Sequence, residues 1–290
     1  MARGSNRVWL LLAALSLGDL VWGAASGLRL SHWRPLALGV LALFAIMLFY
    51  RLSGRSARIA AMAEAPLQWI VFSIAGAVLT YLAAAHAGPL CDRELAAADA
   101  ALGFDWNAWF AFVNRHPAVK FPLAFAYGSL MAQIVLSALW FAWRGADSRN
   151  GELLTHVIAA LAVTAAVCWR LPAVGPGAGV PAIAALYLDD FLGLRAGSLH
   201  AFDVMKLQGI VVFPSFHATL AALFSYAHRG SRLFLPVAAL NAVMLVSIPS
   251  EGGHYLVDLF AGLAVAAGVV LVLRGLPLPT PALARRRQIA

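Results

Sequence analysis

Long apolar runs constrain this chain more than any other feature of its sequence. Hydrophobic residues occupy 62% of the 290 positions and charged residues only 12%, whereas soluble domains are about a quarter charged. One globular core could not bury so much apolar surface, so the hydrocarbon of a lipid bilayer must solvate the rest. The sequence therefore predicts an all-α, polytopic membrane protein.

About eight segments approach the roughly 20 apolar residues that a helix needs to cross a bilayer. They are 8–26, 35–52, 66–87, 118–143, 155–171, 212–227, 233–248 and 254–273. The sixth and seventh are short, which indicates that neighbouring helices shield them or that they start slightly inside the membrane. We expect two transmembrane helices in residues 1–65, a bundle of about six helices in residues 66–275, and a cytoplasmic tail in residues 276–290.

The distribution of positive charge predicts the orientation of these helices. With a cytoplasmic N-terminus, most of the 21 Lys and Arg residues fall inside, and the others lie mainly in long outside connections, which count for less in the positive-inside rule. Both termini are therefore expected in the cytoplasm, below a plasma (inner) membrane. The net charge is +8, and the basic residues lie mostly between apolar runs, where they meet anionic headgroups. No nucleic acid partner is therefore expected.

The two long outside connections carry patterns of their own. Residues 88–117 mix apolar and acidic positions, which predicts an amphipathic helix in the membrane interface. Residues 172–181 are rich in Gly and Pro, and a second interfacial piece is expected at 182–194. The two cysteines, Cys91 and Cys168, are too few for a disulfide framework or a metal cluster, so we expect two free thiols.

The sixth apolar segment opens with Phe213-Pro214-Ser215-Phe216-His217. Proline suits the first turn of a helix, and the free N–H groups of a helix N-terminus favour a phosphate. Ser215 could add a hydroxyl and His217 a proton donor. The alternative interpretation is a helix cap with an interfacial histidine.

The eighth segment opens with residues 250–258, which read Ser-Glu-Gly-Gly-His-Tyr-Leu-Val-Asp. His254 and Asp258 are four residues apart and share one helix face. The aspartate can accept the Nδ1 proton of the histidine, leaving Nε2 as a nucleophile or base. Gly253 and its neighbour Gly252 let a ligand approach the backbone closely. The alternative is a purely structural His–Asp pair.

The sixth and eighth segments both run from outside to inside in the expected topology. Their N-terminal ends therefore open on the same face, and His217 can meet His254 across one pocket. This coincidence favours a functional site over two unrelated structural histidines.

The pattern Pro214-Ser215-x-His217 followed by His254-x-x-x-Asp258 resembles the type 2 phosphatidic acid phosphatase (PAP2) superfamily. The Glu-Gly-Gly-His-Tyr form of the second motif is most similar to the branch that contains inositolphosphotransferases, such as inositol phosphorylceramide synthase. Weaker similarities to this branch lie in residues 92–106, 126–133 and 172–176. The resemblance covers roughly residues 88–273.

The resemblance implies a PAP2-like catalytic domain in residues 66–275 and a role for each motif residue. His254 is implied to form a phosphohistidine, Asp258 to orient it, and His217 to protonate the leaving oxygen. Tyr127 and Gln133 are implied to line the pocket, whereas the residues by themselves predict hydrogen bonds between helices. No metal and no cofactor are implied.

The chain departs from the common PAP2 pattern at its phosphate-binding cations. The arginine expected six residues before the second histidine is Ile248, and the lysine expected in the first motif is Val163. Charge on the phosphoryl oxygens still needs cations or N–H donors, so we expect Arg170, then Lys206, to help Ser215 and Gly253 bind phosphate. Arg170 has an alternative role as a snorkelling helix-end residue.

These observations predict a membrane enzyme that transfers a phosphoryl or phospho-headgroup of a lipid at the outer (periplasmic) face. The first interpretation is a lipid phosphotransferase of inositolphosphotransferase type, because the phosphatase cations are missing. The alternative is a phosphatase that acts on a polyprenyl or glycerolipid phosphate. A rival from another class is a lipid transporter or binding protein with a degenerate site.

Overall fold

The structure is a computed structural model that describes residues 3–185, 187–206 and 209–275. It confirms the predicted all-α architecture of a multi-pass membrane protein. The expected cytoplasmic tail, 276–290, lies outside the described residues.

Six described helices are long and apolar enough to cross a membrane. They are α1 (Arg3–Ser26), α2 (Arg34–Leu52), α3 (Ala57–Ala84), α8 (Asp147–Arg170), α12 (Phe234–Gly252) and α13 (Leu256–Gly275). The helices α6 (Pro117–Gly128) and α7 (Leu130–Trp143) meet at a bend of 47° and together could form a seventh span. The remaining expected segment, the sixth, corresponds to α11 (Phe216–Ala227), which has only 12 residues.

Two predicted spans therefore differ from the structure. Segment 118–143 is not one straight helix but is broken at Ser129, next to Gly128, and Gly/Ser pairs are a common cause of sharp kinks. The sixth span begins at Phe216 instead of residue 212, because Pro214 and Ser215 delay the helix start. Its shortness agrees with the expectation that neighbours shield it.

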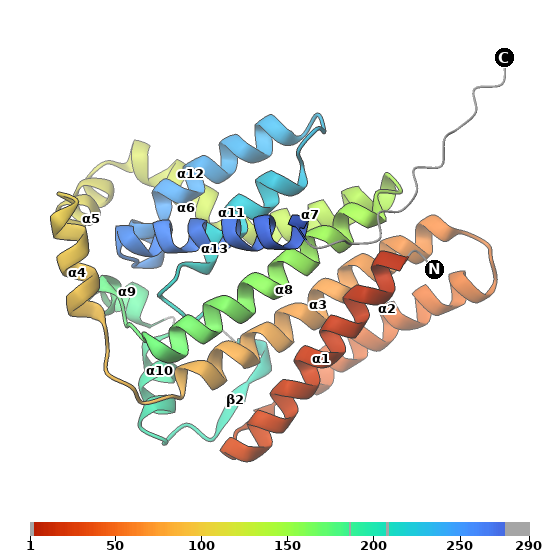
Figure 1. Cartoon of the computed structure of the whole chain (residues 1–290), viewed down its shortest axis with the longest axis horizontal. Coiled ribbons are helices and arrows are strands. Elements are labelled where there is room, and N and C mark those ends of the chain that lie inside the picture. Colours follow the sequence, from red (N-terminus) through yellow and green to blue (C-terminus); the bar gives the residue numbers. More distant parts are fainter. Residues whose placement is uncertain (1–2, 186, 207–208, 276–290) are drawn as a thin grey trace.

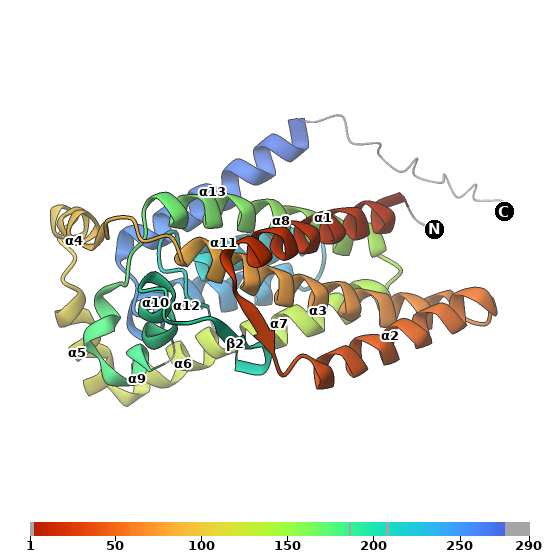
Figure 2. The same cartoon turned by 90° about the horizontal axis from the view of Figure 1, so that it is seen from below.

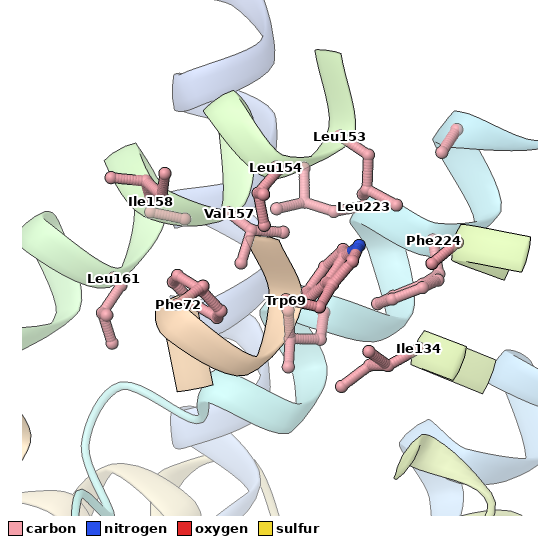
Figure 3. Packing of buried hydrophobic residues seen from close by; sticks show 14 of the residues in the cluster. Trp69, Phe72, Ile134, Leu153, Leu154, Val157, Ile158, Leu161, Leu223 and Phe224 are labelled. Carbon is pink, nitrogen blue, oxygen red and sulfur yellow. The ribbon is translucent and has the colours of Figure 1, made fainter. Parts of the chain in front are cut away.

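The main hydrophobic core lies where α3, α7, α8 and α11 meet. Figure 3 shows Trp69 and Phe72 of α3 facing Leu154 and Val157 of α8, with Phe224 of α11 beside them. The Trp69 ring lies edge-on to Phe72 and tilted against Phe224, each at a centroid distance of 5.7 Å. This core fixes α11, and therefore the first histidine motif, relative to α3 and α8.

The two N-terminal helices pack beside α3 through a polar network as well as apolar contacts (Figure 1). The buried carboxylate of Glu64 on α3 accepts hydrogen bonds from Ser5 and Trp9 of α1 and from Arg51 of α2. A buried carboxylate is costly unless it is paired. This network therefore specifies how α1 and α2 dock.

Two short strands, which the sequence analysis did not predict, join distant parts of the chain. Strand β1 (Arg29–Ser31) pairs in parallel with β2 (Ala201–Asp203). The backbone of the loop after α1 thereby bonds to the long connection between α8 and α11.

The long connections gather at the end of the bundle opposite the N-terminus (Figures 1 and 2). They hold α4 (Asp92–Ala101), α5 (Trp106–Arg115), η1 (Pro176–Gly179), α9 (Pro181–Ala184), α10 (Leu188–Arg195) and η2 (Val204–Lys206). The prediction of a single amphipathic helix in 88–117 was wrong, because the segment forms two helices, α4 and α5. The segment turns at Gly103, whose φ of +75° suits glycine, and Asp105 caps a second helix.

Candidate active site

The first histidine motif forms the N-terminal turn of α11. The Ser215 side chain accepts a hydrogen bond from the Ala218 N–H at 3.4 Å, so Ser215 is the N-cap of the helix. Ser215 is fully buried, and its own N–H donates to the Asp258 carbonyl at 3.0 Å. His217 therefore lies in the first turn of α11, next to the residue that bonds to Asp258 of the second motif.

The second motif forms the turn between α12 and α13. Helix α12 ends at Gly252, and Gly253 follows in the left-handed conformation, with φ +66°. His254 lies in this turn rather than on α13, which begins at Leu256. The expectation that His254 opens the eighth helix was thus wrong by two residues, because Gly253 and the capping of α13 delay the helix start.

The predicted pairing of His254 with Asp258 is present. The Nδ1 atom of His254 lies 3.2 Å from Oδ2 of Asp258, and the Tyr255 N–H donates to the same oxygen at 2.9 Å. Asp258 is fully buried and His254 is nearly so. A carboxylate at this distance accepts a hydrogen bond from Nδ1–H of His254. The proton of the neutral imidazole is then on Nδ1, so the lone pair on Nε2 is available for chemistry.

A close approach of α11 to α13 brings the two motifs together. A Cβ atom at Gly262 of α13 would lie only 2.2 Å from the Ser215 carbonyl oxygen. The Thr219 hydroxyl donates to the Gly262 carbonyl at 2.9 Å. The absence of a side chain at Gly262 thus lets the start of α11 lie against the first turns of α13.

Tyr127 of α6 links the two histidines. Its ring stacks on His217 with a centroid distance of 4.5 Å and an interplanar angle of 10°. A Cβ at Gly252 would meet both the Tyr127 hydroxyl and Cδ2 of His254 at 2.8 Å. Tyr127, His217 and His254 therefore line one compact site.

Other expected pocket residues are placed less directly. Gln133 is buried on α7 and donates to the Ser129 hydroxyl at 3.0 Å. The backbone of Gly253 is approached by Gly177 of the Gly/Pro-rich stretch, whose N–H donates to the Gly253 carbonyl at 3.3 Å. A Cβ at Gly253 would also meet Gly177 Cα and the Ile183 side chain, each at 2.9 Å, so protein atoms pack closely around this glycine.

The two expected cations lie on exposed surface at the same end of the molecule. Arg170 ends α8, and its guanidinium lies over the Trp169 ring at 4.8 Å, while Lys206 is exposed in η2. The described contacts join neither side chain to the paired histidines. Ile248, at the position of the common arginine, is completely buried against Ala218 and Leu259.

Asp99 of α4, for which no role was predicted, caps α13 from another part of the chain. Its two carboxylate oxygens accept hydrogen bonds from the Leu256 N–H at 2.8 Å and the Val257 N–H at 2.9 Å. Asp92, two helical turns earlier on the same face of α4, was missed as well. The seven-residue spacing of two acids on an amphipathic helix was the available signal.

Asp92 connects the Gly/Pro-rich stretch to the second motif. It accepts hydrogen bonds from the N–H groups of Val174 at 3.0 Å and Gly175 at 2.7 Å, and from the Tyr255 hydroxyl at 3.3 Å. Burial, together with the charge of Asp92, raises the pKa of the Tyr255 phenol. The phenol therefore stays protonated at neutral pH and keeps donating to Asp92.

Trp106, at the start of α5, contacts the other end of the second motif. Its indole Nε1–H donates to the Pro249 carbonyl at 2.9 Å, across 143 positions of the sequence. Pro249 lies in the last turn of α12, where carbonyls have no donor within the helix, and Trp106 supplies the missing donor.

Comparison with known proteins identifies the family of this chain. No curated protein and no solved structure matches the chain at a significant level. A family model described as the PAP2 superfamily matches residues 93–272, a range that includes both histidine motifs and the α4–α5 segment. More than half of the 290 residues are covered, and the chain therefore belongs to the PAP2 superfamily.

Proposed function

We propose that this protein transfers a phosphoryl or phospho-headgroup of a membrane lipid through a covalent phosphohistidine at His254. The observation that carries the proposal is the buried His254–Asp258 pair, with 3.2 Å between Nδ1 and Oδ2, in the same compact site as His217. A histidine nucleophile, a carboxylate that orients it and a second histidine are the groups that two-step phosphoryl transfer needs.

The proposed reaction has two displacements. In the first, Nε2 of His254 attacks phosphorus, the bond to the leaving oxygen breaks, and His217 gives that oxygen its proton. In the second, an acceptor hydroxyl loses its proton to His217 and attacks phosphorus, and the P–N bond breaks. His254 and His217 return to their starting states, so protons and electron pairs balance.

The first turn of α11 is suited to bind the phosphoryl oxygens. The N–H groups of Phe216 and His217 have no acceptor within their own helix, and the helix dipole favours an anion there. The corresponding turn of α13 is already occupied by the carboxylates of Asp99 and Asp258. We propose that Ser215, Arg170 and Lys206 complete the phosphate site when a lipid is bound.

The buried Ile248 supports a transferase over a phosphatase. An arginine at this position would hold the phosphoryl group in the common PAP2 pattern, whereas Ile248 is completely buried in an apolar cluster. The site consequently depends more on the lipid and acceptor for positioning. We therefore propose an alcohol acceptor, as in inositolphosphotransferases, at the outer face of the plasma membrane.

Lipid turnover by the purified protein tests the proposal. Micelles would contain phosphatidylinositol, phosphatidic acid and a polyprenyl phosphate, and mass spectrometry would identify the products. We expect a lipid with a transferred phospho-headgroup from the wild type and none from His254→Ala. His116→Ala is the matched control, because His116 is an exposed histidine of the same end of the molecule and should leave turnover unchanged.

Three other outcomes contradict parts of the proposal. Free phosphate without a new lipid would select a phosphatase. Equal turnover by wild type and His254→Ala would remove His254 from the chemistry. Unaltered lipids, together with transport across sealed vesicles that survives His254→Ala, would select a transporter.

A further inference from the structure

We propose that Asp99 is a positioning residue for the reaction, which fixes the first turn of α13 and thereby holds the His254–Asp258 pair in its reactive geometry. This inference rests on the proposed function of that pair. Asp99 touches neither histidine in the described contacts, so its effect passes through the backbone of the turn.

The geometry of Asp99 is that of a helix cap supplied by a different helix. The first N–H groups of α13 have no acceptors within the helix, and Asp99 accepts from two consecutive ones, at 2.8 Å from Leu256 and 2.9 Å from Val257. The side chain is only 3% exposed. A two-pronged contact of this kind fixes both the position and the rotation of the turn.

The rotation of this turn decides where the catalytic carboxylate points. Asp258 lies one residue after Val257, and its Oδ2 must reach both the Tyr255 N–H and Nδ1 of His254. If the turn unwinds, Asp258 loses its direction, and His254 loses the partner that selects its tautomer. Asp99 therefore acts through the backbone N–H groups of the two residues that directly precede Asp258.

A second set of contacts restrains the same motif. Asp92 holds the Tyr255 hydroxyl, and Trp106 holds the Pro249 carbonyl. The α4–α5 segment thus forms hydrogen bonds at both ends of residues 249–257, although it lies about 150 positions earlier in the chain. Catalytic groups held from two sides keep the geometry that transfer requires.

The Asp99 carboxylate also gives the N-termini of α11 and α13 different roles. The negative charge of Asp99 stabilises the positive end of α13 and keeps a second anion away from it. The phosphoryl group is then directed to the first turn of α11, beside His217. A neutral residue at position 99 would remove one of the two carboxylates that occupy the first turn of α13.

Variants of Asp99 and a matched aspartate test this role. Asp99→Ala removes both acceptors, and Asp99→Asn keeps one oxygen. Asp105→Asn is the control, because Asp105 lies in the same segment and also caps a helix, through the Ala108 N–H at 3.0 Å, but the helix is α5. Turnover gives kcat and KM, and amide hydrogen exchange in micelles reports Leu256 and Val257 directly.

We expect kcat to fall about 100-fold in Asp99→Ala, the size of effect that a displacement of about 1 Å produces, with KM changed less than about threefold. Asp99→Asn should lose less, and exchange at Leu256 and Val257 should accelerate in both. Asp105→Asn should match the wild type in both assays.

Each failure has a distinct signature. Unchanged exchange in Asp99→Ala overturns the contact, and faster exchange with wild-type kcat overturns its catalytic importance. An equal loss in Asp105→Asn shows general destabilisation instead of positioning. A wild type without lipid turnover overturns the proposed function, while the exchange rates still decide whether Asp99 caps α13.

Discussion

The contact between α11 and α13 at Gly262 is tight enough that one added methyl group should separate the two histidine motifs. A Cβ at this position would lie 2.2 Å from the Ser215 carbonyl oxygen and 3.1 Å from the Ala218 Cβ. Carbon and oxygen atoms in proteins approach to about 3.3 Å in close contacts. Gly262→Ala must therefore move α11 and α13 apart by about 1.1 Å.

This displacement acts on both stability and catalysis. Overpacking of a tight interior typically costs about 1–3 kcal/mol of unfolding free energy, and the Ser215 N–H to Asp258 bond of 3.0 Å should stretch. A shift of about 1 Å between reacting groups lowers rates about 100-fold. We expect kcat of Gly262→Ala to fall by that factor, with a small loss of thermal stability.

The assay compares Gly262→Ala with Gly268→Ala on the same helix. A Cβ at Gly268 meets nothing within 4 Å, so this substitution should preserve lipid turnover and the thermal unfolding midpoint in detergent. If Gly262→Ala retains both wild-type kcat and wild-type stability, the close packing of the two motifs is refuted.

Three further predictions follow from the described contacts. Asp258→Asn should lower kcat by about 10⁴-fold, because an amide favours the wrong tautomer of His254, and phosphohistidine trapping would show the loss. Glu64→Ala should lower the unfolding free energy by about 2 kcal/mol, because it removes the charged acceptor that Ser5, Trp9 and the half-buried Arg51 share, yet leave kcat of the remaining folded protein near wild type. Burial raises the pKa of the Cys91 thiol to about 11, so at pH 8 it should react with a maleimide about 100-fold more slowly than an ordinary thiol and faster as pH rises; fast labelling at pH 8 would contradict this.

The helices and the two histidine motifs could be read from the sequence because both depend on local signals. Apolar runs of bilayer length located the spans, and Pro214 and Gly253 marked the places where helices begin or end. The spacing of His254 and Asp258 indicated their contact, since four residues is about one helical turn. Even so, the helix limits moved by several residues, because capping by distant groups sets where a helix starts.

The contacts that hold the site in place were decided only by the tertiary structure. Asp99 meets Leu256 and Val257 across 157 and 158 positions of the chain, and β1 pairs with β2 across a comparable distance. Hydrogen bonds of this kind leave no periodic pattern in the sequence, because each partner alone looks like an ordinary polar residue at a loop or helix end. The sequence thus determined the apolar helices and the places of the two histidine motifs along the chain, and it predicted that the motifs open on one face. Only the packing of α4, α11 and α13 determined that these motifs meet. The helices can approach one another closely because Gly252 and Gly262 have no side chain that would clash with Tyr127 or the Ser215 carbonyl.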